Sequence, residues 1–179
     1  MAPGSAEGSG HLSSVPRKVV LSSGERVPYP EPSSAAATKI GIANRRRDTA
    51  VELRLRSELH ARGLRFRKDL LLQVGTVRVH PDIVFTRARV AVFLDGCFWH
   101  ACPEHGTVPK SNVTYWAPKL AANTDRDQRV NEALTKDGWL VRRVWEHEDL
   151  ALVADEIEPI VRSRSARRRA PPGGPTVGP

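Results

Sequence analysis

Three segments of the chain carry apolar residues at helical spacing. The first is 49–62, where Thr49 and Glu52 match a capping box and Gly63 follows as a stop signal. The second covers about 117–138 and ends at a glycine, and the third covers about 149–161. The apolar positions that predict their buried faces are Val51, Leu55, Leu59, Leu120, Val130, Leu134, Leu150, Leu152, Val153, Ile157 and Ile160.

Short runs rich in β-branched and aromatic residues lie between these helices and predict strands. The runs "RVHPDIVF" (78–85) and "VAVFLDG" (90–96) are separated by "TRAR" and predict a hairpin. Residues 64–75 predict a strand and a loop, 97–116 have the composition of a loop, and 139–148 predict a further strand. The order α-β-β-β-α-β-α predicts an α/β domain built on a small mixed sheet flanked by helices.

The two ends of the chain differ from this middle part in composition. Residues 1–38 are rich in Ser, Gly, Pro and Ala, and 163–179 form a basic, Pro/Gly-rich tail, so both segments are predicted to be disordered. The predicted folded domain is therefore 39–162. No apolar run is long enough to span a bilayer, and no signal peptide opens the chain. The sequence therefore predicts a cytoplasmic protein that is not associated with a membrane.

The charge of the chain points to a polyanionic partner. The formal net charge is +8 over 179 residues, which favours nucleic acid first and an anionic membrane surface second. No basic amphipathic helix suited to a membrane surface is evident. We expect phosphate contacts from arginines before the first helix and in the tail: Arg45, Arg46, Arg47, Arg162, Arg164, Arg167, Arg168 and Arg169.

Two aspartates belong to the predicted hairpin. If its turn is centred between Ala88 and Arg89, Asp82 and Asp95 face each other across the strands. Facing carboxylates repel unless a cation lies between them, and Mg²⁺ prefers such oxygen ligands. The alternative is that Asp82 marks a strand entrance and Asp95 precedes a turn glycine.

The stretch "VFLDGCFWHACPEHG" (92–106) carries both cysteines of the chain. Cys97, Cys102 and His105 form a C-x4-C-x2-H group, and His147 follows the last predicted strand. Two thiolates and two imidazoles suit tetrahedral zinc without an open position, which predicts a structural site. His100 and Glu104 are alternative ligands, and buried free thiols with surface histidines are the alternative to a metal site.

The same stretch holds a histidine and two large aromatic residues to which the zinc site assigns no role. His100 lies beyond the carboxylate end of the hairpin, where a general base is useful, although a lone histidine is more often structural. Phe98 and Trp99, and similarly Trp116, either pack in a core or act as apolar wedges that unstack base pairs.

These segments, taken together, resemble a known family. "RRRDTAVELRLRSELHARGLRFR", "HPDIVF", "VFLDGCFWHACPEH", "PKSNVTYWAPKLAANTDRDQRV" and "LTKDGWLVRRVWEHE" are similar to the very-short-patch-repair (Vsr) DNA mismatch endonucleases over roughly 43–150. The resemblance implies a restriction-endonuclease-like fold of the PD-(D/E)xK type with a structural zinc site. It also implies a strand-specific, Mg²⁺-dependent nick at T:G mismatches, which arise from deaminated 5-methylcytosine.

The resemblance also implies roles for single residues. Asp82 matches the principal Mg²⁺ ligand, Leu94 a position whose backbone carbonyl also binds the metal, and His100 the catalytic histidine. Glu52 matches an acidic residue that supports the metal through water, a role compatible with its capping box. The aromatic wedge corresponds to Phe98, Trp99 and Trp116, and zinc-ligand positions to Cys97, Cys102 and His147.

The chain departs from the family pattern at two places. Asp95 stands where a histidine can occur, so a carboxylate ligand replaces the imidazole; "HACPEH" replaces a histidine run, which makes His105 the expected fourth zinc ligand. The resemblance further implies a monomer acting on double-stranded DNA, with mismatch-repair proteins as partners by analogy. Two alternatives stay open: a restriction- or defence-type nuclease of the same fold, and a non-catalytic, zinc-stabilised DNA-binding module.

Overall fold

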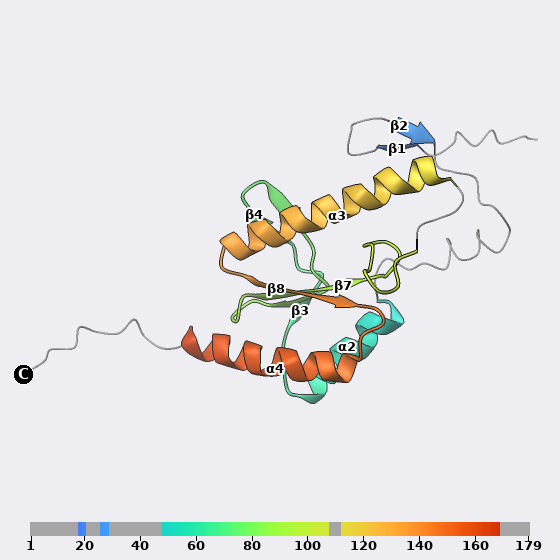
Figure 1. Ribbon diagram of the computed structural model, residues 1–179. Helices are drawn as coiled ribbons and strands as arrows, with labels where there is room; N and C mark the ends of the chain where they lie inside the picture. The colour runs from blue at the N-terminus through green and yellow to red at the C-terminus, as the bar shows by residue number, and fades with distance from the viewer. Residues whose placement is uncertain (1–17, 21–25, 29–47, 108–111, 169–179) are drawn as a thin grey trace, which may run out of the picture.

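The structure, a computed structural model, describes residues 18–20, 26–28, 48–107 and 112–168 (Figure 1). Its helices are α2 (Ala50–Ala61), α3 (Val113–Lys136) and α4 (Leu150–Arg167). Its strands are β1 (Lys18–Val20), β2 (Arg26–Pro28), β3 (Arg67–Lys68), β4 (Leu72–Val74), β5 (Val77–Val79), β6 (Ile83–Phe85), β7 (Val90–Asp95) and β8 (Leu140–Trp145).

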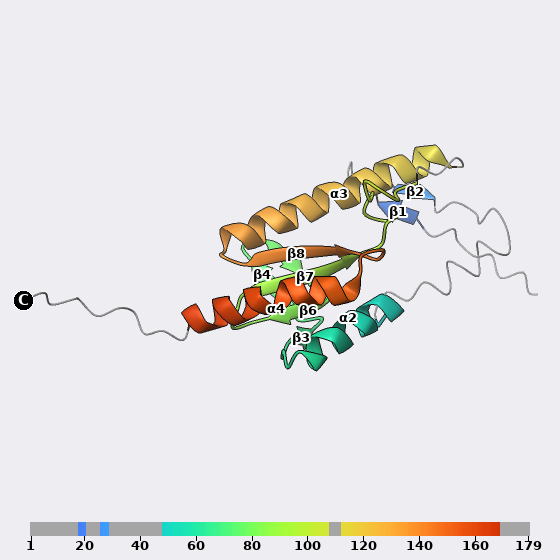
Figure 2. The same cartoon turned by 60° about the horizontal axis from the view of Figure 1, so that its bottom comes forward.

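A mixed four-stranded sheet in the order β3-β6-β7-β8 forms the centre of the domain. β3, β6 and β7 pair antiparallel, whereas β7 and β8 are parallel, because the chain returns to the sheet through α3. α2 and α4 cover one face, and α3 covers the other (Figures 1 and 2). The predicted α/β architecture, a small mixed sheet flanked by helices, is thereby confirmed.

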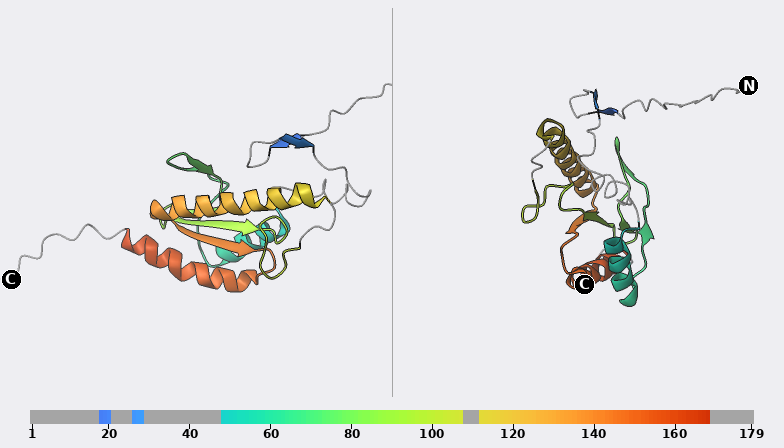
Figure 3. Two further views of the ribbon diagram at one scale, coloured as in Figure 1. Left: turned by 45° about the horizontal axis from the view of Figure 1, so that its top comes forward. Right: turned by 90° about the vertical axis from the view of Figure 1, so that its right-hand side faces the viewer.

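Two apolar cores hold these layers together. The larger core packs Leu55 and Leu59 of α2 and Ile157 of α4 against Ile83 of β6 and Val144 of β8, all of which are at most 1% exposed. The smaller core joins α3 to the opposite face of the sheet and to the β4–β5 hairpin, which projects beside α3 (Figure 3). Burial of this apolar area fixes the ends of β6 and β7 between the helical layers.

The helix boundaries follow the expected caps at one helix and differ at the two others. Thr49 and Glu52 form the predicted capping box of α2, and Gly63 adopts φ +73° just after it. α3 begins at Val113, inside the segment predicted as loop, because Tyr115 is buried and anchors the first turn. α4 extends past the predicted end at 161 to Arg167.

The register of the β6–β7 hairpin corrects the predicted alignment of the two aspartates. Ile83 pairs with Val92, so continuing the ladder places Asp82 opposite Phe93 and not opposite Asp95. The turn is centred one residue earlier than expected, since Ala88 is fully buried against the core. Asp82 and Asp95 are therefore diagonal neighbours, a relation in which side chains on one face still approach each other.

Two observations bear on the ends of the chain. The paired strands β1 and β2 lie within the segment 1–38 that composition predicts to be disordered, where Val19 pairs with Val27. α4 takes up residues 163–167 of the predicted disordered tail. Within the described residues, none of the helices combines the length and apolar character needed to cross a membrane.

Candidate active site and metal centre

A cleft of about 590 Å³ opens between the end of β7, the β4–β5 hairpin and the middle of α3. Its lining combines acidic groups, two imidazoles and several arginines. The lining residues that bear polar or charged side chains are Thr76, Arg78, His80, Asp82, Asp95, His100, Arg126, Asp127, Arg129 and Arg143. The structure thus brings three of the predicted catalytic residues, Asp82, Asp95 and His100, into one cleft.

Asp82 lies just before β6 and turns its carboxyl group toward β7. The backbone N–H of Leu94 donates to its Oδ2 at 2.7 Å. Burial, with smaller contributions from the negative charges of Glu52 and Asp95, outweighs the hydrogen bond from Leu94 and raises the pKa of Asp82 to about 6. A buried carboxyl group with two acidic neighbours is a site where a divalent cation relieves the repulsion.

Glu52 is placed near Asp82 by the first turn of α2, and both of its carboxylate oxygens have partners. One oxygen accepts from the Thr49 hydroxyl at 3.0 Å, and the other from the Asp48 N–H at 3.0 Å and from Arg56 Nη2 at 3.2 Å. Glu52 is only 8% exposed. These bonds leave Glu52 as a fixed negative charge beside the cleft, which suits a role through water better than a direct one.

Asp95, at the end of β7, is 3% exposed and is paired with an arginine of β8. Arg143 Nη1 lies 2.9 Å from its Oδ1 and 2.7 Å from its Oδ2. His100 Nδ1 is 3.6 Å from the same Oδ1. The second predicted carboxylate of the site is therefore neutralised by a neighbouring cation in the structure, unlike Asp82.

His100 makes its shortest contact with a residue that the sequence analysis did not select. Its Nδ1 lies 2.5 Å from Oδ2 of Asp127 on α3. Burial would raise the pKa of Asp127, but the bond from His100 and the charge of Arg143 outweigh it and lower the pKa. An ionised carboxylate only accepts, so Nδ1 of His100 donates in this contact; in the neutral imidazole this tautomer has its lone pair on Nε2.

Asp127 was overlooked because it stands in a strongly charged helical segment, "DRDQR", that reads as a solvated face. The only signal was its place in "NTDRD" (123–127), an N-x-x-RD motif within the segment "PKSNVTYWAPKLAANTDRDQRV" that resembles the family. The asparagine of that motif, Asn123, donates from its side-chain amide to the Trp99 carbonyl at 3.0 Å. The motif thus ties α3 to the loop after β7 at two points.

The predicted zinc ligands come together at the other side of this loop. Within the described residues, one ligand atom from each of Cys97, Cys102, His105 and His147 lies within 4.8 Å of every other. Cys97 Sγ is 3.1 Å from His147 Nδ1, and Cys102 Sγ is 3.8 Å from it. Two thiols and two imidazoles at these separations fit one tetrahedral metal ion.

The surroundings of the cysteines also favour a metal ion. Burial raises the pKa of the Cys97 thiol, and the nearby Cys102 and Glu146 raise it further. Two adjacent thiolates need a cation to be stable in such a place. Glu146 accepts the Cys97 N–H at 2.8 Å, and Glu104, the alternative ligand, lies 3.5 Å from His147 Nε2 with its side chain 71% exposed.

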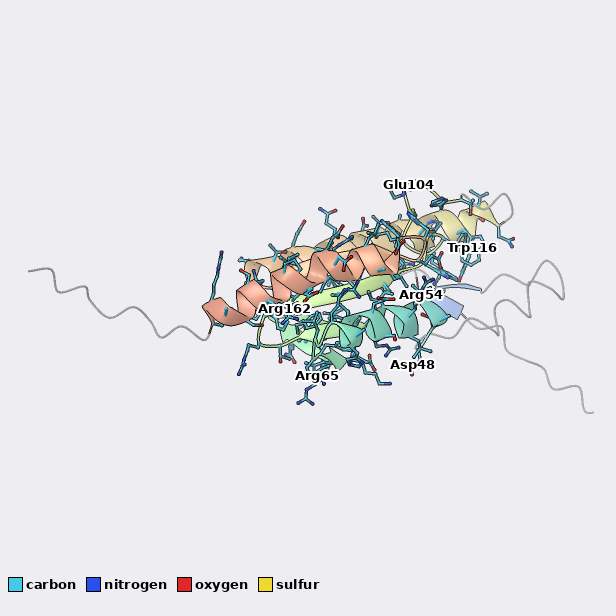
Figure 4. All side chains as sticks on the ribbon, turned by 90° about the horizontal axis from the view of Figure 1, so that it is seen from below. Asp48, Arg54, Arg65, Glu104, Trp116 and Arg162 are labelled. Carbon is cyan, nitrogen blue, oxygen red and sulfur yellow. The ribbon has the colours of Figure 1, made fainter. Side chains whose placement is uncertain are left out.

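The three predicted wedge residues form an aromatic cluster outside both cores. The ring centroids of Phe98, Trp99 and Trp116 are 5.0–5.6 Å apart, and each side chain is half-buried. Figure 4 shows Trp116 at the same end of the molecule as Glu104, beside the start of α3. The three rings pack edge-to-face on one another, and Tyr115 packs on Trp116 beside them.

Two of the arginines expected to contact phosphates have partners within the protein instead. Arg164 donates to the carbonyls of Ala88 and Gly138 at 2.8 Å each, and Arg162 donates to Glu158 and to the Arg62 carbonyl. These two side chains therefore hold α4 on the domain. Arg45, Arg46, Arg47 and Arg169 lie outside the described residues, and the structure records no contact for Arg167 that decides its role.

Comparison with known proteins is consistent with this geometry. The family model described as DNA mismatch endonuclease Vsr matches residues 34–104. The type II nicking enzyme V.NaeI of Lentzea aerocolonigenes is 55% identical over 123 residues, which cover 68% of this chain and 74% of that enzyme. The type II nicking enzyme V.XorIIP of Xanthomonas oryzae is 47% identical over 109 residues, covering 58% and 74%. The DNA mismatch endonuclease Vsr of Escherichia coli is 38% identical over 104 residues, covering 56% and 62%.

Proposed function

The chain belongs to the Vsr family of DNA endonucleases, and on this basis we propose that it nicks one strand of double-stranded DNA at T:G mismatches in a Mg²⁺-dependent reaction. Such nicks initiate very short patch repair of deaminated 5-methylcytosine. The catalytic part of this proposal rests on one observation: Asp82 and the His100–Asp127 pair line the same cleft. We propose a monomer acting in the cytoplasm.

The acidic side of the cleft is the place for the cation. Asp82, together with the backbone carbonyl of Leu94, would hold Mg²⁺, which when bound polarises the scissile phosphate and offsets its developing charge. The N–H of Leu94 fixes the Asp82 carboxyl group at 2.7 Å, so the oxygen ligand is oriented in advance. Glu52 and Asp95 add negative charge nearby without being free to turn, because Arg56 and Arg143 hold them.

The imidazole side of the cleft supplies the base. Asp127 holds the proton of His100 on Nδ1, so Nε2 accepts a proton from the attacking water. The carboxylate also stabilises the imidazolium that forms in this step. A neutral imidazole fixed in this tautomer acts as a general base through Nε2.

The metal centre of Cys97, Cys102, His105 and His147 has a structural role in this proposal, with Zn²⁺ as the ion. It joins the loop after β7 to the end of β8. His100 lies inside this loop, between the two cysteines. Zinc therefore fixes the backbone that presents the base and the aromatic cluster.

DNA recognition is proposed to combine phosphate contacts with an apolar wedge. Arg78, Arg126 and Arg129 line the walls of the cleft, where a phosphodiester backbone leading to Asp82 would pass. The cluster of Phe98, Trp99 and Trp116 is proposed to enter the stack beside the mismatch. Unstacking costs less at a mismatch than at a paired step, so the wedge contributes selectivity.

A strand-resolved nicking assay tests the proposal. Duplexes that differ only in carrying T:G, T:A or C:G are compared with and without Mg²⁺, for the wild type and for Asp82→Asn. We expect Mg²⁺-dependent cleavage of the T strand of the T:G duplex alone, lost in Asp82→Asn. Tight binding to T:G DNA without any cleavage would refute the catalytic assignment and favour the DNA-binding module.

Several relatives are named type II nicking enzymes, and one alternative is therefore a restriction-type nuclease of the same fold, which we would expect to cut matched DNA as well. Equal cleavage of the matched and mismatched duplexes would support that alternative. The residues around Asp82 and His100 would serve both activities, since both hydrolyse the same phosphodiester bond. Only the substrate comparison separates the two.

A further inference from the structure

Arg143 lies in β8 and lines the cleft, where the proposed mechanism uses it only as the partner of Asp95. Its side chain is 18% exposed. Its neighbour Arg142 points to the other face of the sheet, where it pairs with Glu148 at 2.7 Å and Glu156 at 3.1 Å. These two adjacent arginines therefore lie on opposite faces of the sheet and have different partners.

Each nitrogen of the Arg143 guanidinium has a partner in the structure. Nη1 bonds both oxygens of Asp95, at 2.9 and 2.7 Å, and Nη2 lies 3.1 Å from Oδ1 of Asp127. Nε donates to Oδ1 of Asn131 at 3.0 Å, and the Phe93 ring centroid is 4.8 Å from Cζ. The planar group is thus fixed from β7 and α3 together.

These contacts make Arg143 a link between the two sides of the cleft. Asp127 uses Oδ1 for Arg143 at 3.1 Å and Oδ2 for His100 at 2.5 Å, and these two contacts set its rotation about the Cβ–Cγ bond. The exposed Arg126 side chain makes only a longer contact, 3.5 Å, with the same Oδ1. Asp95, one element away, is held by the same guanidinium. Without this cation, two largely buried carboxylates would repel each other across the cleft.

We propose that Arg143 is a positioning residue that orients Asp127 and thereby holds His100 in the Nδ1–H tautomer, while it also keeps Asp95 in place. The inference deepens the proposed function, since orientation of His100 matters for the nicking reaction. It differs from a simpler role in which Arg143 only neutralises the buried Asp95. It differs also from a role in which the guanidinium binds a DNA phosphate.

The test uses the full-length, zinc-loaded protein without DNA. The tautomer of His100 is measured from the ¹⁵N resonances of its ring, assigned with His100→Gln. The variants are Arg143→Lys, Arg143→Gln and, as a matched control on the opposite face, Arg142→Gln. The double variant Asp95→Asn/Arg143→Gln removes both charges of the buried pair, so it keeps the test valid if Arg143→Gln alone does not fold.

We expect the Nδ1–H tautomer in the wild type and in Arg142→Gln, and a mixture of tautomers in Arg143→Gln and in the double variant. Arg143→Lys should recover part of the wild-type signal, because it restores the charge but not the three-way geometry. Single-turnover nicking by Arg143→Gln should fall about 100-fold, as expected for a misplaced base. The Kd for the DNA without divalent ions should not change.

A wild-type tautomer in the folded double variant would overturn the proposal and leave Arg143 as the counter-ion of Asp95. Weakened DNA binding by Arg143→Gln with an unchanged rate would overturn it in favour of a phosphate contact. The tautomer measurement does not depend on the DNA substrate. The loss of the Nδ1–H tautomer would therefore support the placement of Arg143 even if the wild type failed to discriminate T:G from matched DNA.

Discussion

His100 Nδ1 lies 2.5 Å from Asp127 Oδ2, although 27 positions separate the two residues in the sequence. One stands in the loop after β7 and the other in the middle of α3. Neither element alone contains a catalytic pair. The pair exists because α3 crosses the face of the sheet next to the end of β7.

Asp127→Asn tests this pair. The amide offers either an oxygen or an NH₂ group to the imidazole, so His100 loses its fixed tautomer, and nicking should fall about 100-fold or more. The measurement is the single-turnover nicking rate. Asp125→Asn, two residues earlier on an exposed turn of the same helix, is the matched control and should nick at the wild-type rate. Equal rates for the two variants would remove Asp127 from the mechanism.

Asp82→Asn should make the protein more stable while it abolishes nicking. The pKa of Asp82 is raised from 3.8 to about 6, so its carboxyl group favours the folded state only while it is protonated. This contribution is present below about pH 4 and is lost as the pH rises through 6. Above pH 7 the asparagine variant should gain roughly 2–3 kcal/mol in free energy of unfolding.

Denaturant unfolding in magnesium-free buffer at pH 4 and pH 7.5 measures this difference. The two proteins should have nearly the same stability at the lower pH and separate at the higher one. A difference that is independent of pH would mean that the raised pKa of Asp82 does not contribute to stability. Added Mg²⁺ should stabilise the wild type and not the variant, since only the wild type keeps the ionisable ligand.

Removal of the metal should release the loop that carries His100. We expect one zinc ion per chain by metal analysis, and a strongly lowered midpoint of thermal unfolding after treatment with a chelator. Cys102→Ser and His147→Ala should both lose zinc. His105→Ala should also lose zinc, whereas Glu104→Ala should retain it; the reverse result would make Glu104 the fourth ligand.

Trp99→Ala should separate DNA distortion from folding. Loss of the ring should lower nicking of T:G DNA roughly 10- to 100-fold, since stacking on an aromatic side chain contributes about 1–3 kcal/mol per base. Zinc content should stay at the wild-type level. A fluorescent base analogue beside the mismatch reports unstacking directly. Trp139→Ala, at a residue that packs on the smaller core and does not line the cleft, should leave that signal intact.

Arg164 and Arg126 should respond in opposite ways to the same change. Arg164→Gln removes two hydrogen bonds to the Ala88 and Gly138 carbonyls, so it should cost about 1–2 kcal/mol of stability. It should not alter the salt dependence of DNA binding. Arg126→Gln should leave stability unchanged and reduce the slope of log Kd against log salt by about 1. A reduced slope for Arg164→Gln would restore the phosphate role expected from sequence.

Much of the fold was predictable, because the signals were local. The capping box of Thr49 and Glu52, the glycine stop at Gly63 and the β-rich runs of β6 and β7 depend on neighbours in sequence. The turn of the hairpin was placed one residue too late, since the burial of Ala88 is a tertiary effect. The start of α3 was missed for the same reason, because Tyr115 is buried by contacts that composition does not show.

The candidate site divides in the same way. The cysteines and histidines of the metal centre have a spacing that only few chemical roles require, and the structure brings all four together. Asp127 and Arg143 carry no such spacing, because each acts through a partner on another element. The roles of such charged residues can be recognised only once the fold shows that α3 and β8 lie beside β7.

The parallel pairing of β7 with β8 determines where the chain can accept an inserted residue. Phe93 is aligned with Arg143 and Asp95 with Trp145, so one residue inserted at the Gly138 turn would exchange the two faces of β8. The Arg143 side chain would then point to the other face of the sheet, and an adjacent residue of β8 would take its position in the cleft. The turn at Gly75, between β4 and β5, joins a separate hairpin that does not share this ladder. Insertions are therefore expected to be tolerated at Gly75 and to inactivate the enzyme at Gly138.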